Sequence, residues 1–267
     1  MKNFSEILFG VENHVATITL NRPEAYNALS DVMRNELRTA IKYIKNNEDQ
    51  IRIVVLTGAG KAFCAGGDVK MMKQRIENGV DYEERLTFYR KDVEDMVYRF
   101  RSIRQPTIAA INGHAFGAGC SIALLCDMRV ASERAKFGMP FGKRGLVPDW
   151  GATYTLPRLL GTGKAMELAF TGKAFDAQEA LRIGLINVIY PAEELMTGVR
   201  SLCDDMLTSS PFSTYAAKQL MINGLNSSLE TAMKAEGEAQ SACFCSDDHR
   251  EGVDSFLEKR NPQFTGK

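Results

Sequence analysis

Residues 106–119 have the sequence Pro106-Thr-Ile-Ala-Ala-Ile-Asn-Gly-His-Ala-Phe-Gly-Ala-Gly119 and combine three structural signals. The proline precedes a continuous apolar run, Thr107 to Ile111, which is typical of a strand buried on both faces. The glycines that follow predict a tight turn, and the apolar residues from Cys120 to Leu125 predict a helix. A further strand is expected near Met128 to Ala131. This order of strand, turn, helix and strand predicts an α/β fold.

The same order recurs on the N-terminal side of this segment. Residues 14–20 alternate apolar and polar side chains, as a half-buried strand does, and residues 7–9 are the expected hairpin partner. Ser30 can cap a helix whose apolar residues, between Met33 and Ile44, recur on one face. Residues 52–57 form a second continuous apolar run that ends at a glycine-rich turn, which again predicts a buried strand.

Residues 86–100, just before this segment, mark a long amphipathic helix. On the C-terminal side of the segment, residues 176–179 resemble a capping box that opens a short helix, and residues 185–189 predict a strand. Strand patterns then disappear, and the remaining sequence is helical and polar-faced. We therefore predict a core over residues 1–191 and a helical region over residues 192–267 that covers the core or packs on another subunit.

The composition is that of an ordinary globular protein. The chain has 267 residues, 45% of them hydrophobic and 25% charged, which argues against disorder. Its 33 basic and 33 acidic residues balance, so no global field would attract nucleic acid or an anionic membrane. Polar residues interrupt the longest apolar stretch and no signal core precedes it, so we expect a cytoplasmic protein without a membrane span. Six irregularly spaced cysteines and three histidines predict neither a disulfide framework nor a metal site.

Two glycine-rich turns follow buried strands and are candidates for chemistry. The first, residues 58–68, departs from a phosphate-binding loop because Lys61 is followed by Ala62. The second, residues 112–120, opens a helix whose free N–H groups favour developing negative charge. Tight packing alone would explain either turn, but on neighbouring strands the two could supply the backbone donors of one oxyanion hole.

A third candidate is Asp149, which lies in the apolar segment 146–150. Burial among apolar side chains raises the pKa of a carboxyl group, which suits a general base that works near neutral pH. Asp149 could equally cap a helix that begins near Gly151. The spacing leaves both roles open.

Four motifs occur in a fixed order along the chain: Arg22-Pro-Glu-Ala-Tyr-Asn-Ala-Leu29, Ala62-Phe-Cys-Ala-Gly-Gly-Asp68, the segment 106–119, and Leu156-Pro-Arg-Leu-Leu-Gly161. Together they resemble the crotonase, or enoyl-CoA hydratase/isomerase, superfamily. The likeness begins near residue 5 and includes residues 246–260, which are similar to the family's C-terminal segment.

This resemblance implies a spiral of ββα units with a C-terminal helical trimerisation region, and an acyl-CoA substrate bound by a homotrimer or a dimer of trimers. By matching position, the N–H groups of Gly67 and Ala118 would hold the thioester oxygen as it becomes an enolate. No separate cofactor is implied, because the coenzyme A is part of the substrate. The positions expected to contact or shape the substrate site are Arg22, Ala28, Ala65, Gly66, Asp68 and Phe141, with Phe256 and Lys259 acting from a neighbouring subunit.

Two departures from the family pattern narrow the reaction. Hydratases of this family use two glutamates, and the matching positions here carry Ser121 and Phe141, neither of which is a carboxylic acid. Asp149 remains, and its position resembles that of the base in enoyl-CoA isomerases and in the ring-forming isomerase of phenylacetate degradation. We therefore predict that Asp149 isomerises a 3-enoyl-CoA to a 2-enoyl-CoA.

Three alternatives stay open on the sequence. Asp149 could activate water in an enoyl- or dienoyl-CoA hydratase, with Ser121 orienting that water, although Phe141 would make the pocket drier. Asp149 could instead be a nucleophile, as in a related aromatic acyl-CoA dehalogenase with an aspartate at this position. The third alternative is an acyl-CoA-binding scaffold that has lost catalysis together with the two glutamates.

Overall fold

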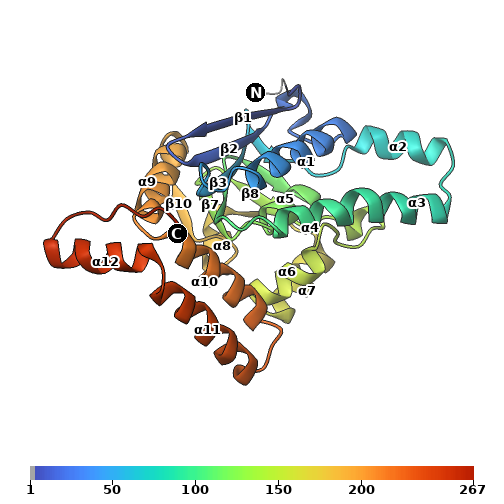
Figure 1. Ribbon diagram of the computed structural model, residues 1–267. Coiled ribbons are helices and arrows are strands. Elements are labelled where there is room, and N and C mark those ends of the chain that lie inside the picture. The colour runs from blue at the N-terminus through green and yellow to red at the C-terminus, as the bar shows by residue number, and fades with distance from the viewer. Residues whose placement is uncertain (1–3) are drawn as a thin grey trace.

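The computed structural model describes residues 4–267 and contains two sheets flanked by helices (Figure 1). In the larger sheet the strand order is β1-β2-β3-β5-β7-β10, and all neighbours are parallel except the β1–β2 hairpin. Its strands are β1 (Ile7–Glu12), β2 (Val15–Leu20), β3 (Ile53–Gly58), β5 (Thr107–Ile111), β7 (Met128–Ser132) and β10 (Val188–Tyr190). The two continuous apolar runs form β3 and β5 inside this sheet, as the sequence predicts.

The strand predicted over residues 185–189 begins later, at Val188. The N–H groups of Leu185 and Ile186 donate to the carbonyl of Ala180, at 2.8 and 3.3 Å, and so close the end of the preceding helix. Both side chains are nevertheless buried in the core. Their apolar character therefore reflects core packing rather than strand pairing.

The smaller sheet was not apparent from hydrophobic periodicity, because its strands are only two or three residues long. Its strands, in spatial order, are β4 (Ala62–Cys64), β6 (His114–Phe116), β8 (Lys136–Gly138) and β9 (Phe175–Asp176). β4 follows β3 and leads into helix α2 (Val69–Glu77), and β6 follows β5 and leads into helix α5 (Ala118–Ala123). These two successive ββα units confirm the architecture that the resemblance implied.

Two helices begin at the caps that the sequence predicted. The hydroxyl of Ser30 accepts from the N–H of Met33, and Asp176 accepts from the N–H of Glu179, as predicted. The helix predicted over residues 86–100 is interrupted by a π-helical turn, η2 (Tyr89–Glu94). The α-helices are α1 (Asp31–Lys45), α2 (Val69–Glu77), α3 (Tyr82–Phe88), α4 (Asp95–Arg101), α5 (Ala118–Ala123), α6 (Ala152–Leu160), α7 (Thr162–Thr171), α8 (Ala177–Arg182), α9 (Leu195–Leu207), α10 (Pro211–Gly224), α11 (Leu229–Phe244) and α12 (Asp247–Glu258).

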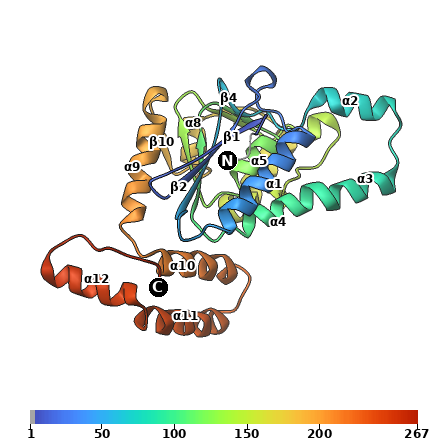
Figure 2. The ribbon, with the colours of Figure 1, turned by 45° about the horizontal axis from the view of Figure 1, so that its top comes forward.

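The C-terminal helices do not all belong to one layer. Helix α9 buries Leu195, Val199 and Cys203 against the larger sheet. Helices α10, α11 and α12 form a separate layer beyond the core (Figure 2), tied to it by an ion pair of 2.6 Å between Lys218 and Asp127. The division of the chain at residue 191 stays a prediction. Within residues 4–267, every helix is too short or too polar to span a bilayer.

Candidate active site

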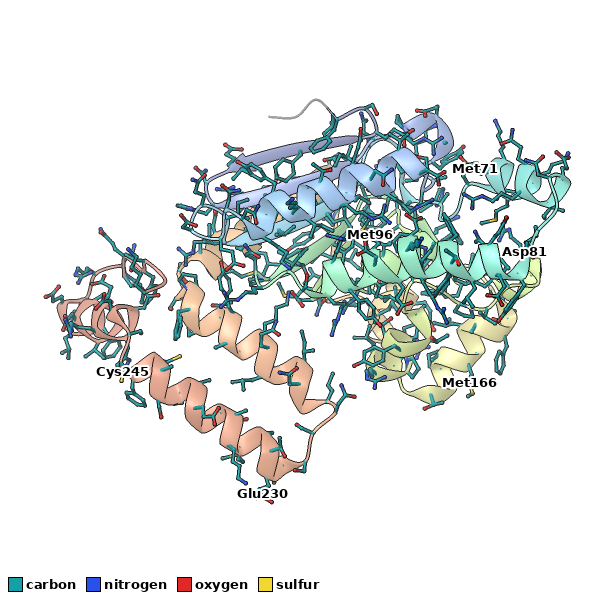
Figure 3. The ribbon with its side chains drawn as sticks, turned by 45° about the vertical axis from the view of Figure 1, so that its right-hand side comes forward. Met71, Asp81, Met96, Met166, Glu230 and Cys245 are labelled. Atoms are coloured by element: carbon teal, nitrogen blue, oxygen red, sulfur yellow. The ribbon has the colours of Figure 1, made fainter. Side chains whose placement is uncertain are left out.

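A cavity of about 190 Å³ lies where the two glycine-rich turns meet the arm, the name used here for residues 69–88 of α2 and α3. Figure 3 shows this arm at the side of the molecule, with Met71 on α2 and Asp81 just before α3. The structure thus gathers segments that are far apart in the sequence. The predicted site residues on the cavity wall are Ala65, Gly67, Asp68, Ala118, Phe141 and Asp149.

Close backbone contacts hold the two turns together. A Cβ added at Gly119 would lie 2.1 Å from the backbone oxygen of Cys64, and a Cβ added at Gly66 would lie 2.7 Å from that of Phe116. Gly66 also has a φ of +98°, a conformation that favours glycine. Because Gly66 and Gly119 have no side chain, the turn after β4 packs directly on the turn after β6.

Two backbone donors on the cavity wall are unused. Neither the N–H of Gly67 nor that of Ala118 donates a hydrogen bond to another residue between 4 and 267. Ala118 is the first residue of α5, and helices leave such N–H groups free. Its nitrogen is 3.2 Å from the point that a Cβ on Gly66 would occupy, so it lies beside the first turn. Two free donors from separate chain segments thus serve one cavity.

Asp149 presents an unsatisfied carboxylate to the same cavity. Its Oδ1 atom is buried and has no hydrogen-bond partner within the described residues. Burial raises the pKa of Asp149 from 3.8 to about 6, although the positive charge of Arg85 acts in the opposite direction. A carboxyl group with this pKa is ionised at neutral pH and is a stronger base than an exposed aspartate.

Asp149 does not cap a helix, which was the second role that its position in the sequence left open. Helix α6 begins at Ala152 with Gly151 as its N-cap, and no side chain makes a capping hydrogen bond there. Trp150 and Gly151 have φ angles of 52° and 76°, so the chain turns sharply between Asp149 and the helix. A left-handed conformation is unusual for tryptophan. The side chain of Trp150 is only 4% exposed, so the surrounding packing holds the residue in this conformation. The turn leaves the carboxylate on the cavity wall instead of over the helix.

The two positions at which the resemblance expects glutamates differ in their surroundings. Ser121 is fully buried and donates to the carbonyl of Gly117 at 3.2 Å, which leaves it behind the cavity wall. Phe141 lies on the wall with its ring near Gly117, 3.8 Å from the point that a Cβ there would occupy. One position is therefore engaged with the helix backbone, and the other contributes an apolar ring.

Arg22, Ala28 and Gly66 lie next to the cavity wall but are not part of it. The guanidinium of Arg22 donates to the carbonyl of Ala28 at 2.7 Å and forms ion pairs with Asp68 at 3.4 Å and with Glu6 at 3.2 Å. Asp68 also caps α2 by accepting from two backbone N–H groups. This network fixes the start of the arm against the first turn.

Phe256 and Lys259 lie far along the chain on the outer layer and do not reach the cavity of their own chain. Phe256 is 82% exposed, and Lys259 ends α12 in a left-handed conformation. Their contribution from a neighbouring subunit stays a prediction.

The sequence did not fix which side chains of the arm face the cavity. Met72, Arg85 and Phe88 all lie on the cavity wall. Residue spacing along a helix does not show whether one of its faces meets a cavity or the core.

The repeated ββα units and the cavity between their turns define a crotonase-type fold. A sequence model of the family described as enoyl-CoA hydratase/isomerase matches residues 10–267, and the chain belongs to this family. It is therefore a member of a family of acyl-CoA-processing enzymes.

Relatives of the chain differ in the reaction that their names state. A short-chain-enoyl-CoA hydratase of Clostridium acetobutylicum is 36% identical over 257 residues, covering 96% of each chain. A 1,2-epoxyphenylacetyl-CoA isomerase of Escherichia coli is 38% identical over 265 residues, covering 98% of each. The crystal structure of an enoyl-CoA hydratase from Bacillus anthracis superposes with a TM-score of 0.92 at 34% identity, covering 98% of this chain and 100% of the other. These relatives show the family, but their names do not decide whether this chain is a hydratase or an isomerase.

Proposed function

We propose that this protein is an enoyl-CoA isomerase that moves a double bond from the 3- to the 2-position through one base, Asp149. The observation that carries the proposal is the lone uncommitted carboxylate. Asp68 is the other acidic residue on the cavity wall, and its oxygens cap α2 and pair with Arg22. Addition of water in the two-glutamate manner requires a second acid or base, whereas isomerisation requires only one.

In the proposed reaction, Asp149 takes a proton from C2 of a 3-enoyl thioester. The electron pair of that C–H bond forms the enolate, whose oxygen accepts hydrogen bonds from the N–H groups of Gly67 and Ala118. The protonated Asp149 then returns its proton to C4, and the double bond settles between C2 and C3. Atoms balance without water or a separate cofactor. Preformed backbone donors of this kind typically contribute about 10²–10³ in rate each.

The direct test is to incubate the protein with 3-hexenoyl-CoA and, separately, with crotonyl-CoA, following the conjugated thioester by absorbance and the products by mass. We expect conjugation of the first substrate without a change in mass, and no reaction of the second. Water added to crotonyl-CoA, seen as a mass increase, would contradict the isomerase proposal.

A hydratase is the second candidate, because hydratase is the reaction stated for several of the relatives. In that case Asp149 would activate water. Ser121 would not orient it, since its hydroxyl is turned to the Gly117 carbonyl behind the cavity wall. The crotonyl-CoA arm of the experiment distinguishes this candidate, and binding of both thioesters without turnover would favour a scaffold.

We further propose that the outer helices mediate a homotrimer, alone or within a dimer of trimers. Helices α10, α11 and α12 expose apolar side chains, and a groove of about 1080 Å³ lies between α10 and α11 on one side and the core on the other. The most exposed of these apolar residues are Met221, Leu225, Leu229, Phe256 and Leu257. Native mass spectrometry of the whole chain should give a multiple of three subunits, and a stable monomer would contradict the proposal.

A further inference from the structure

Four arginines lie on the wall of the proposed active-site cavity: Arg34, Arg75, Arg85 and Arg144. Asp68 and Asp149 are the acidic residues on the same wall. A pocket for an unbranched, uncharged acyl chain needs apolar side chains and no such concentration of positive charge. The excess of cations is therefore unexplained by the reaction alone.

Two of the four arginines are neutralised by the protein. Arg34 is buried and forms ion pairs with Asp31 and Asp92. Arg75 lies 3.4 Å from the same Asp31 carboxylate. These two side chains are accounted for as structural supports of the arm.

Arg85 and Arg144 have no such partners. Neither makes an ion pair with any residue between 4 and 267. Among residues 4–267, the one side-chain hydrogen bond of Arg144 goes to the carbonyl of Pro140 at 3.5 Å, which is long for a bond of this kind. With Asp68 committed to Arg22, the wall carries two unpaired guanidinium groups and one unpaired carboxylate, Asp149.

The guanidinium of Arg85 is also held in place. It lies 4.7 Å from the centre of the Phe88 ring, within the range of a cation–π contact. Arg75 lies 4.7 Å and Arg34 5.4 Å from the same ring, so two ion-paired arginines share Phe88 with the unpaired Arg85. Stacking fixes the plane of a guanidinium while leaving its edge N–H groups available to an oxygen ligand.

Arg85 is exposed at the cavity wall, and its guanidinium is only partly shielded from solvent. That partial shielding and the neighbouring charge of Arg75 lower the pKa of Arg85, while the charge of Asp149 raises it. A second anion bound beside Arg85 would act in the same direction as Asp149. The cavity of about 190 Å³ is below the ~300–1,000 Å³ of sites that enclose a whole small ligand, so it suits an acyl group with the nucleotide outside.

We propose that the natural substrate is an acyl-CoA whose acyl group carries a second carboxylate, bound at its far end by Arg85 with support from Arg144. The proposal deepens the proposed function and rests on it for the identity of the cavity as the acyl site. A planar carboxylate accepts two parallel N–H bonds from a guanidinium, which an ammonium or an amide cannot match. The phosphates of coenzyme A are the competing anions for these arginines.

Binding of unreactive thioesters tests the proposal without relying on turnover. Isothermal titration calorimetry should show that the whole protein binds adipoyl-CoA about tenfold or more tightly than hexanoyl-CoA. The methyl ester of adipoyl-CoA, which has the length but not the charge, should bind like hexanoyl-CoA. Equal affinity for the three thioesters would overturn the proposal.

Two variants separate the acyl carboxylate from the phosphates. Arg85→Met keeps an unbranched apolar stem without the guanidinium and should weaken the binding of adipoyl-CoA about 10- to 100-fold, while the binding of hexanoyl-CoA changes less than about threefold. Arg90→Met is the matched control: Arg90 is exposed like Arg85 but lies on η2 and off the cavity wall, and the substitution removes the same unit of charge. Equal weakening of both thioesters by Arg85→Met would assign Arg85 to the coenzyme and contradict the proposal.

The outcome is distinguishable from that of the isomerase assay. Preference for adipoyl-CoA without conjugation of any 3-enoyl-CoA would support the carboxylate site and contradict the isomerase. Conjugation of 3-hexenoyl-CoA with no preference for 3-hexenedioyl-CoA or adipoyl-CoA would support the isomerase and contradict the carboxylate site.

Discussion

Replacing Asp149 by asparagine should lower kcat for 3-hexenoyl-CoA by about 10²–10⁴ while the cavity keeps its shape. The amide has the size of the carboxylate but cannot take a proton from C2. The Oδ1 atom of Asp149 has no partner among the described residues, so no structural hydrogen bond is lost with it. The rate of appearance of the conjugated thioester measures the effect.

The control for this variant is Asp81→Asn. Asp81 caps α3 by accepting from the N–H of Glu84, and asparagine caps helices about as well as aspartate does. We expect this variant to keep the wild-type rate within about twofold. Binding of hexanoyl-CoA should be similar in both variants, and full turnover by Asp149→Asn would remove Asp149 from the mechanism.

The pH dependence of the wild-type protein should report the same group. Because the base must be ionised, kcat/KM should fall tenfold per unit as the pH decreases below the pKa of Asp149, which is about 6. If the base were an exposed aspartate, kcat/KM would stay constant down to about pH 4. A profile that stays flat between pH 7 and pH 4.5 would contradict the assignment.

Stability should change in the opposite sense to activity. The pKa of Asp149 is about 6 in the folded chain against 3.8 for an ordinary aspartate, so the folded state binds this proton more tightly than the unfolded state. The carboxylate therefore costs stability above pH 6, on the order of 2–3 kcal/mol, and the cost disappears as the pH falls towards 3.8. Asp149→Asn should raise the free energy of unfolding at pH 8 and leave it almost unchanged at pH 4.

Patterns in the local sequence predicted the fold and the glycine-rich turns. The positions of the site side chains depend on contacts between distant segments, which such patterns do not show. The apolar runs over residues 52–57 and 107–111 form strands β3 and β5. They could be predicted because a continuous apolar run is visible in the local sequence alone. The role of Asp149 depended on the left-handed conformation of Trp150, which a bulky residue adopts only when surrounding packing enforces it. No periodicity signals such a turn.

Arg85 illustrates the same limit for the site. It lies in a polar stretch of α3, and its sequence neighbours indicate a solvated helix face. Its place on the cavity wall arises because the arm folds back over the turns that carry Gly67 and Ala118. The resemblance supplied those glycine-turn positions, but it said nothing of a charge on the opposite wall.

Replacing Gly119 by alanine should lower kcat for 3-hexenoyl-CoA by about 10², although Gly119 makes no contact with substrate in the proposed reaction. The new Cβ would lie 2.1 Å from the backbone oxygen and 2.6 Å from the carbonyl carbon of Cys64. Backbone atoms cannot rotate away, so the turn that carries Gly67 must move relative to α5. A shift of this size separates the two donors that the enolate oxygen needs to contact together.

Two further glycine-to-alanine variants show whether the loss of turnover depends on what the new Cβ meets. Gly163→Ala introduces the same methyl group in helix α7 with nothing within 4 Å, and should leave turnover unchanged while stabilising the helix by about 0.5–1 kcal/mol. Gly67→Ala keeps the proposed donor N–H, and its Cβ would meet only the flexible end of Met72, at 2.3 Å. We expect less than a tenfold loss there, because Met72 can move where Cys64 cannot. A greater loss for Gly67→Ala than for Gly119→Ala would mean that the spacing of the two turns is not what places the donors.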